Sequence, residues 1–92
     1  MDSNRSGPVG AGPTDEQIRE LFATLLQVDA AKIDDRTSPA SLERWDSLQH
    51  MILVAGFEEE FGVDLDPEEA VEMFQNFATF KRILRQRMES RS

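Results

Sequence analysis

The sequence predicts an all-α protein: a small antiparallel four-helix bundle with three longer helices, one short third helix and a long loop between the first two. Two observations lead to this fold class. Apolar residues recur at the three- and four-residue spacing of helices, and residues that begin or end helices separate these stretches. No segment convincingly alternates apolar and polar residues over four or more positions, so no strands are expected.

The chain has 92 residues, which suits one small domain. Residues 1–13 contain three of the five glycines and two of the four prolines, so they are predicted to form a flexible tail. Residues 14–88 are predicted to form the folded domain. The polar residues 89–92 are expected to be a frayed end.

The first helix begins after Thr14, which together with Gln17 matches a capping box. Its apolar stripe consists of Ile18, Leu21, Phe22, Leu25 and Leu26. Residues 28–45 then form a long connection rich in turn-forming residues, including Ser38 and Ser41. A loop of this length needs anchors, and the sequence supplies Ile33, Leu42 and Trp45.

The second helix is predicted to begin at Asp46-Ser47, to run to Phe61 and to stop at Gly62. Asp66 followed by Pro67 predicts the start of the short third helix, which ends near Phe74. The last helix is capped by Asn76 or, alternatively, by Thr79. The predicted core consists of Ile18, Leu21, Phe22, Leu25, Val54, Phe57, Phe61, Phe80 and Leu84.

Composition excludes several classes of function. A formal net charge of −8 argues against a nucleic-acid partner and favours a basic protein partner. Without cysteine there is no disulfide, thiolate zinc site or cysteine nucleophile, and one histidine excludes a multi-histidine metal site. We therefore expect neither an enzyme nor a metal protein. We also expect a monomer without a membrane span, located in the cytoplasm because the N-terminus lacks the apolar core of a signal peptide.

The acidic turn from Asp64 to Glu69 superficially suggests a calcium loop. It lacks the central glycine and the acidic twelfth position that such a loop requires, so no metal site is predicted there.

The most informative stretch is Trp45-Asp46-Ser47-Leu48. If Asp46 caps the second helix, Ser47 lies in the first turn with a free hydroxyl, and a phosphoryl group on it would face unpaired N–H groups. Spacing alone leaves a second interpretation open, in which Ser47 is itself the cap.

Three features of this chain resemble the acyl carrier protein family. They are the triplet Asp46-Ser47-Leu48, the run Glu58-Glu59-Glu60-Phe61-Gly62, and the turn 64–69 before a short helix. The resemblance covers residues 14–88. It implies that Ser47 carries 4′-phosphopantetheine, attached covalently from coenzyme A by a phosphopantetheinyl transferase. It also implies that the protein delivers acyl groups as thioesters to partner enzymes, in a dedicated fatty-acid, polyketide or other secondary-metabolite pathway.

The resemblance also implies a docking face on the second helix for acyl-loading and acyl-accepting enzymes with basic patches. We predict this face to consist of Leu48, Met51, Ile52, Ala55, Glu58 and Glu59.

The chain departs from the usual family pattern on both sides of the triplet. Arg44 and Trp45 replace a glycine and a small residue, while Gln49, His50 and Ile52 stand where acidic residues are common. His50 is expected to be solvated, and Ile52 to be an exposed apolar residue, either a stray surface side chain or a partner contact. The Trp-Asp-Ser-Leu form resembles dedicated, free-standing carriers.

Two other functions remain open at this point. An aminoacyl or peptidyl carrier usually has Gly and His before the serine, so Trp45 and Asp46 favour acyl cargo. The other is a helical interaction module without modification, in which Ser47 is only a helix cap.

Overall fold

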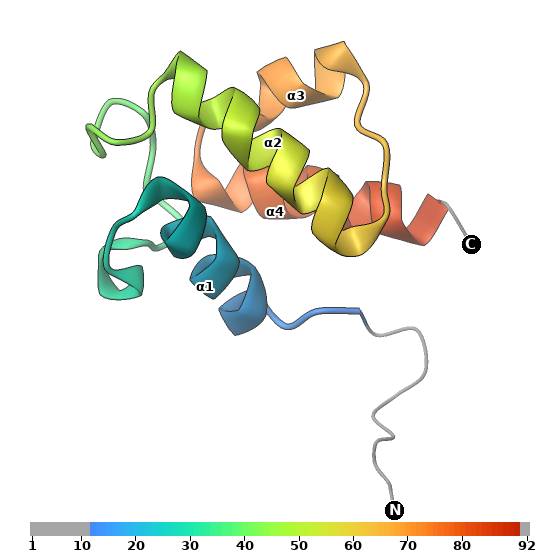
Figure 1. Cartoon of the computed structure of the whole chain (residues 1–92), viewed down its shortest axis with the longest axis horizontal. Helices are drawn as coiled ribbons and strands as arrows, with labels where there is room; N and C mark the ends of the chain where they lie inside the picture. The colour runs from blue at the N-terminus through green and yellow to red at the C-terminus, as the bar shows by residue number, and fades with distance from the viewer. Residues whose placement is uncertain (1–11, 91–92) are drawn as a thin grey trace, which may run out of the picture.

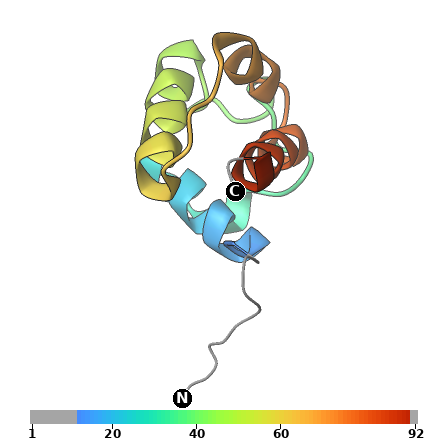
Figure 2. The same ribbon diagram turned by 90° about the vertical axis from the view of Figure 1, so that its right-hand side faces the viewer.

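A computed structural model describes residues 12–90 of the chain. Its helices are α1 (Asp15–Leu26), the 3-10 helix η1 (Ala30–Lys32), α2 (Ser47–Phe61), α3 (Pro67–Met73) and α4 (Phe77–Ser90). No strand occurs within residues 12–90, and the predicted all-α bundle is confirmed. In Figure 1, α1 and α3 run opposite to α2 and α4, and Figure 2 shows the four helices around a common centre. Most of the predicted tail and the last two residues, 1–11 and 91–92, lie outside the described residues.

Each α-helix begins as the sequence predicted. The capping box of α1 is formed: Gln17 N–H donates to Thr14 Oγ1 over 3.1 Å, and Thr14 N–H donates to Gln17 Oε1 over 2.8 Å. Of the two candidate caps of α4, Asn76 is the one used, because its Oδ1 accepts from Thr79 N–H at 2.7 Å. The predicted frayed end 89–92 begins within α4, which extends to Ser90.

Large aromatic side chains fill the centre of the bundle. Phe22 of α1 meets the rings of Trp45, Phe77 and Phe80 edge to face, with centroids 4.8–5.1 Å apart. Each such pair contributes about 0.5–1.5 kcal/mol beyond the burial of its area. Of the predicted core, Ile18, Phe22, Val54, Phe57, Phe80 and Leu84 are buried, whereas Leu21, Leu25 and Phe61 are partly buried at its edge.

The long loop is tied down over most of its length. Ile33 and Trp45 are buried and Leu42 packs against the core, as predicted. The sequence did not reveal η1, whose first turn is capped by the Asp29 side chain accepting from Ala31 N–H at 3.2 Å.

The loop also caps α4, because Phe77 N–H donates to the Thr37 carbonyl at 2.8 Å and Ala78 N–H donates to the Asp35 carbonyl at 3.3 Å. The loop therefore supplies partners for N–H groups that a helix start leaves unpaired.

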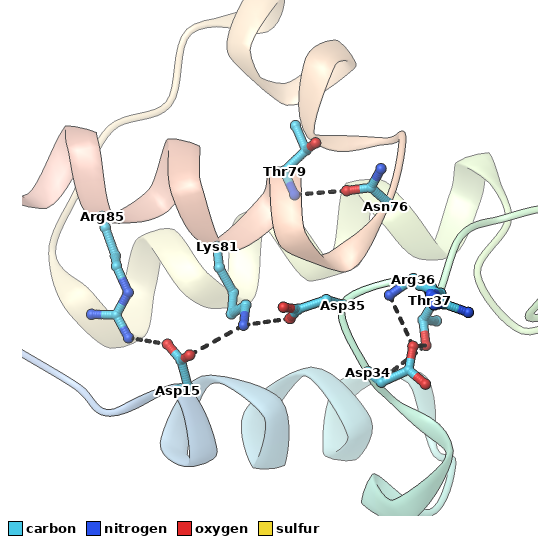
Figure 3. Close-up of polar contacts among 9 residues, drawn as sticks. All are labelled: Asp15, Asp34, Asp35, Arg36, Thr37, Asn76, Thr79, Lys81 and Arg85. Atoms are coloured by element: carbon cyan, nitrogen blue, oxygen red, sulfur yellow. Dashed lines mark hydrogen bonds and ion pairs between the residues drawn. The ribbon is translucent and has the colours of Figure 1, made fainter.

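One lysine joins three parts of the fold, as Figure 3 shows. Lys81 of α4 places its Nζ 2.7 Å from Asp35 Oδ1 in the loop and 3.2 Å from Asp15 Oδ2 of α1. Arg85, one turn further along α4, pairs with the same Asp15 carboxylate. The hydrogen bonds from Arg85 and Lys81 hold the pKa of Asp15 below its ordinary value. This network ties the loop at Asp35 to α1 and α4.

α2 packs closely on α1. A Cβ at Gly56 would lie 2.8 Å from Leu25 Cδ1, so glycine allows the two helices to approach. α2 ends at Gly62, which has the left-handed φ of 65° expected of a glycine stop. Within residues 12–90, no helix has the length and apolar character required to cross a membrane.

Candidate functional site

The start of α2 settles which residue is its cap. Asp46 has extended backbone angles, φ −103° and ψ −178°, and its Oδ1 accepts from Gln49 N–H at 2.8 Å. Ser47 is therefore the first residue of the helix and not its cap. The interpretation in which Ser47 serves as the cap is excluded by this geometry.

Ser47 is exposed, and its hydroxyl forms no hydrogen bond within residues 12–90. The two other serines nearby differ. Ser38 N–H donates to Ser41 Oγ at 2.9 Å, and Ser41 Oγ donates to the Ser38 carbonyl at 3.2 Å, so both serve the loop.

A phosphate attached to Ser47 Oγ would lie at the positive end of α2, beside the first N–H groups of the helix. Of the three serines, Ser47 alone combines exposure, a free hydroxyl and a helix start.

The residues on either side of this turn are joined to each other. Trp45 Nε1–H donates to His50 Nδ1 at 3.0 Å, and His50 Nε2 lies 2.7 Å from the carbonyl oxygen of Ala70 in α3. Trp45 is fully buried and His50 is 6% exposed. The prediction of a solvated His50 is therefore wrong. The ring packs against Trp45, against Phe74 at the end of α3 and against Phe80 of α4.

Burial also sets the charge state of His50. Removal from water lowers the pKa of His50 below its ordinary value of 6.5, and the hydrogen bond to the Ala70 carbonyl opposes this change only in part. The ring is therefore neutral at neutral pH. This neutral ring links α2, the end of the loop and α3.

Arg44, the other departure from the expected pattern, also has a structural role. Its Nε–H donates to the Leu26 carbonyl at 3.0 Å, and its Nη2 donates to Gln27 Oε1 at 3.0 Å. Leu26 is the last residue of α1, so the guanidinium meets the negative end of that helix. Arg44 and Trp45 thus fix the loop end immediately before the Asp46–Leu48 turn.

Apolar side chains are exposed next to Ser47. Leu48 is 66% exposed, Met51 69% and Ile52 45%, and Ala55 is exposed one turn further along α2. Val71 of α3, which sequence reasoning did not single out, is 73% exposed and follows Ala70, the residue bound to His50. Large apolar residues that are exposed as a group mark an interaction surface, whereas single exposed ones carry no such meaning.

The acidic end of α2 divides into two roles. Glu58 is half-buried, and its Oε2 accepts from Leu65 N–H at 2.8 Å in the connection to α3. Glu59 is exposed and forms no ion pair within residues 12–90. The structure therefore gives Glu58 a role in holding the connection, which its position in an acidic run did not reveal.

The acidic turn before α3 is also engaged in structure. Asp66 N–H donates to Glu69 Oε1 at 2.9 Å, and Arg87 of α4 lies 2.8 Å from the same carboxylate. The hydrogen bond from Arg87 lowers the pKa of Glu69. Among the described residues, no three His, Cys, Asp or Glu side chains are grouped so as to hold a metal ion.

Comparison with known proteins identifies one family. The family model described as a phosphopantetheine attachment site matches residues 16–84, from the first turn of α1 to the middle of α4. The matched range includes the whole of α2 and its exposed Ser47. No solved structure matches the chain.

Proposed function

The chain belongs to the phosphopantetheine-attachment family of carrier proteins, and from this premise we propose that Ser47 is the residue that carries 4′-phosphopantetheine. When bound, the group supplies a thiol at the end of a long arm, on which cargo is held as a thioester. The observation that carries the proposal is the free, exposed hydroxyl of Ser47 at the start of α2. The carrier domain extends over residues 14–88.

The residues around Ser47 fit the attached group. Asp46 satisfies Gln49 N–H and leaves the N–H groups of Ser47 and Leu48 for a phosphate at the helix start. Attachment requires that Ser47 Oγ bond to the phosphorus of the pantetheine half of coenzyme A. The pyrophosphate bond breaks, the nucleotide half leaves, and the serine proton passes to the transferase or to water. Carrier domains of this family are modified in this way by a separate transferase and are not themselves the catalyst.

We propose that Leu48, Met51, Ile52, Ala55, Glu58 and Glu59 form the docking face for the transferase and the pathway enzymes. Exposure of three large apolar side chains beside the attachment serine supports this proposal. Apolar contact supplies affinity, while the exposed carboxylate of Glu59 and the net charge of −8 steer basic partners. Glu58 belongs to this face by position, but its carboxylate accepts a hydrogen bond from Leu65 N–H and so stabilises the connection to α3.

The cargo is proposed to be an acyl group, in a dedicated fatty-acid, polyketide or other secondary-metabolite pathway. The residues before the serine support this choice, because peptidyl carriers usually have Gly and His where this chain has Trp45 and Asp46. Both residues are committed here to structure: Trp45 is buried in the core and Asp46 caps α2. An aminoacyl or peptidyl carrier is the second candidate.

Two experiments test these proposals in turn. Intact mass spectrometry after incubation with coenzyme A and a broad-range transferase should show the addition of one phosphopantetheine group. The holo protein is then offered to an acyl-activating ligase and to an aminoacyl-adenylating enzyme. Faster acyl loading supports the acyl assignment, and faster aminoacyl loading replaces it with the second candidate. A protein that accepts no phosphopantetheine contradicts the proposed attachment itself.

A further inference from the structure

Trp45 and His50 enclose the attachment turn. Asp46 is the helix cap, so Trp45 occupies the position before the cap and His50 the fourth helical position. These are the two positions that a hydrophobic staple joins across a helix start. Here the staple also contains a hydrogen bond, between Trp45 Nε1 and His50 Nδ1 at 3.0 Å. Ser47 lies in the exposed turn between these two buried anchors.

The chemistry of the indole fixes the direction of both hydrogen bonds. An indole N–H can only donate, so His50 Nδ1 must accept and cannot carry a proton. The proton of the neutral ring is then on Nε2, which donates to the Ala70 carbonyl at 2.7 Å. A continuous chain of two hydrogen bonds therefore joins the loop end, the first turn of α2 and α3.

We propose that Trp45 and His50 are positioning residues for Ser47: their hydrogen-bonded pair holds the first turn of α2 in the arrangement that the transferase accepts. The inference rests on the proposed attachment at Ser47. Without the pair, the turn samples other conformations, and binding weakens in proportion to the lost fraction of the competent state. The deficit is therefore expected in KM for the carrier and not in kcat.

Protonation of His50 should raise KM in the same way as loss of the hydrogen bond between Trp45 and His50. A proton on Nδ1 would face the indole N–H of Trp45, so two donors would meet. The nearest carboxylates along the chain are engaged elsewhere, Asp46 with Gln49 N–H and Glu69 with Arg87. On α4, Lys81, which follows the contacting Phe80, is paired with Asp15 and Asp35.

Amide substitutions separate the two hydrogen bonds. In His50→Asn, the amide oxygen can take the place of Nδ1 and accept from Trp45, while the contact to Ala70 is lost. In His50→Gln, the amide nitrogen can take the place of Nε2 and donate to Ala70, while the acceptor for Trp45 is lost. Trp45→Phe removes the indole N–H and keeps a ring. Phe74→Leu is the packing control, because Phe74 contacts both rings and takes part in neither hydrogen bond.

The experiment measures kcat and KM for transferase modification of the full chain, together with the melting temperature of each variant. The loss of one buried hydrogen bond predicts that Trp45→Phe and His50→Gln raise KM about tenfold with kcat unchanged. His50→Asn and Phe74→Leu should keep KM near the wild-type value even where they lower the melting temperature. Trp45→Phe remains informative if a histidine variant fails to fold.

The pH profile supplies the second readout. The ratio of the wild-type KM to that of His50→Asn should rise as pH falls through the lowered pKa of His50, since the amide does not titrate. A KM that follows melting temperature across all four variants would overturn the positioning role. If the wild type is modified normally and KM is unchanged in Trp45→Phe and His50→Gln, the positioning role is overturned while the attachment at Ser47 stands. A wild-type protein that is not modified at Ser47 would overturn both the attachment and this role.

Discussion

The indole of Trp45 donates a hydrogen bond to the imidazole of His50, and these are the only tryptophan and the only histidine in the chain. The fluorescence of Trp45 therefore reports on the same contact that His50 controls. Because both residues flank the attachment turn, the unfolding of this region can be followed with a single probe.

The first prediction concerns the pH dependence of stability. Burial lowers the pKa of His50 in the folded protein below the ordinary 6.5 of the unfolded chain. The unfolded state therefore binds the proton more tightly, and acid favours unfolding. The contribution of His50 to the free energy of unfolding should be complete above about pH 6.5. It should decrease as pH falls from there and level off below the lowered pKa of the folded state.

Urea unfolding at several pH values, followed by Trp45 fluorescence, measures this dependence. His50→Gln should lose the change between about pH 6.5 and the lowered pKa of His50, because an amide has no proton to bind there. The carboxylates of Asp15 and Glu69 have lowered pKa values, so their contribution is lost only at more acid pH. Equal slopes for the wild type and His50→Gln in that interval would show that His50 is not buried as described.

The second prediction separates two roles of Asp46. As the N-cap of α2, its replacement by alanine should cost about 0.5–2 kcal/mol of stability. Asparagine caps as well as aspartate, so Asp46→Asn should melt close to the wild type. If the negative charge beside Ser47 helps the transferase, Asp46→Asn is nevertheless modified more slowly. Thermal melting and initial modification rate of the apo protein are measured side by side.

Two results would revise this assignment. Equal destabilisation by asparagine and alanine would contradict the capping geometry. Modification of Asp46→Asn at the wild-type rate would leave Asp46 with a structural role alone.

The third prediction distinguishes Glu58 from Glu59, which are neighbours in sequence. Glu58→Ala leaves Leu65 N–H without its acceptor and should cost about 1–3 kcal/mol, whereas Glu58→Gln retains an acceptor oxygen and should cost less. Glu59→Lys changes an exposed side chain, so stability should stay within about 0.5 kcal/mol of the wild type. Its effect should be slower modification at low salt, which diminishes as salt screens the charge.

The measurements are urea unfolding and modification rates over a salt series, with Glu59→Gln as the milder charge variant. If Glu59→Lys is modified at the wild-type rate at every salt concentration, Glu59 does not belong to the docking face.

Local signals in the sequence were sufficient for the helix starts. Thr14 with Gln17, Asp46, and Asn76 act through N–H groups within three residues, so spacing made each of them a candidate cap. The stop at Gly62 is equally local, since it depends on one left-handed residue. For Ser47 the spacing left two interpretations, first helical residue or cap, and the hydrogen bond from Gln49 N–H to Asp46 decides for the first.

Contacts between distant segments could not be obtained in this way. His50 is buried because Ala70, Phe74 and Phe80 converge on it from α3 and α4, and no spacing within α2 reports their approach. One signal was nevertheless present: Trp45 and His50 stand at the two positions of a hydrophobic staple. Glu58 offered no such signal, because its partner Leu65 lies beyond the end of the helix.

Site-resolved mass spectrometry determines whether Ser47 is the residue that carries the phosphopantetheine. Wild type, Ser47→Ala, Ser38→Ala and Ser41→Ala are incubated with coenzyme A and a broad-range transferase, and the modified fragment is sequenced. One added group is expected on Ser47 in the wild type and in both loop variants, and none in Ser47→Ala. A group that persists in Ser47→Ala, or that maps to Ser38 or Ser41, would contradict the attachment at Ser47.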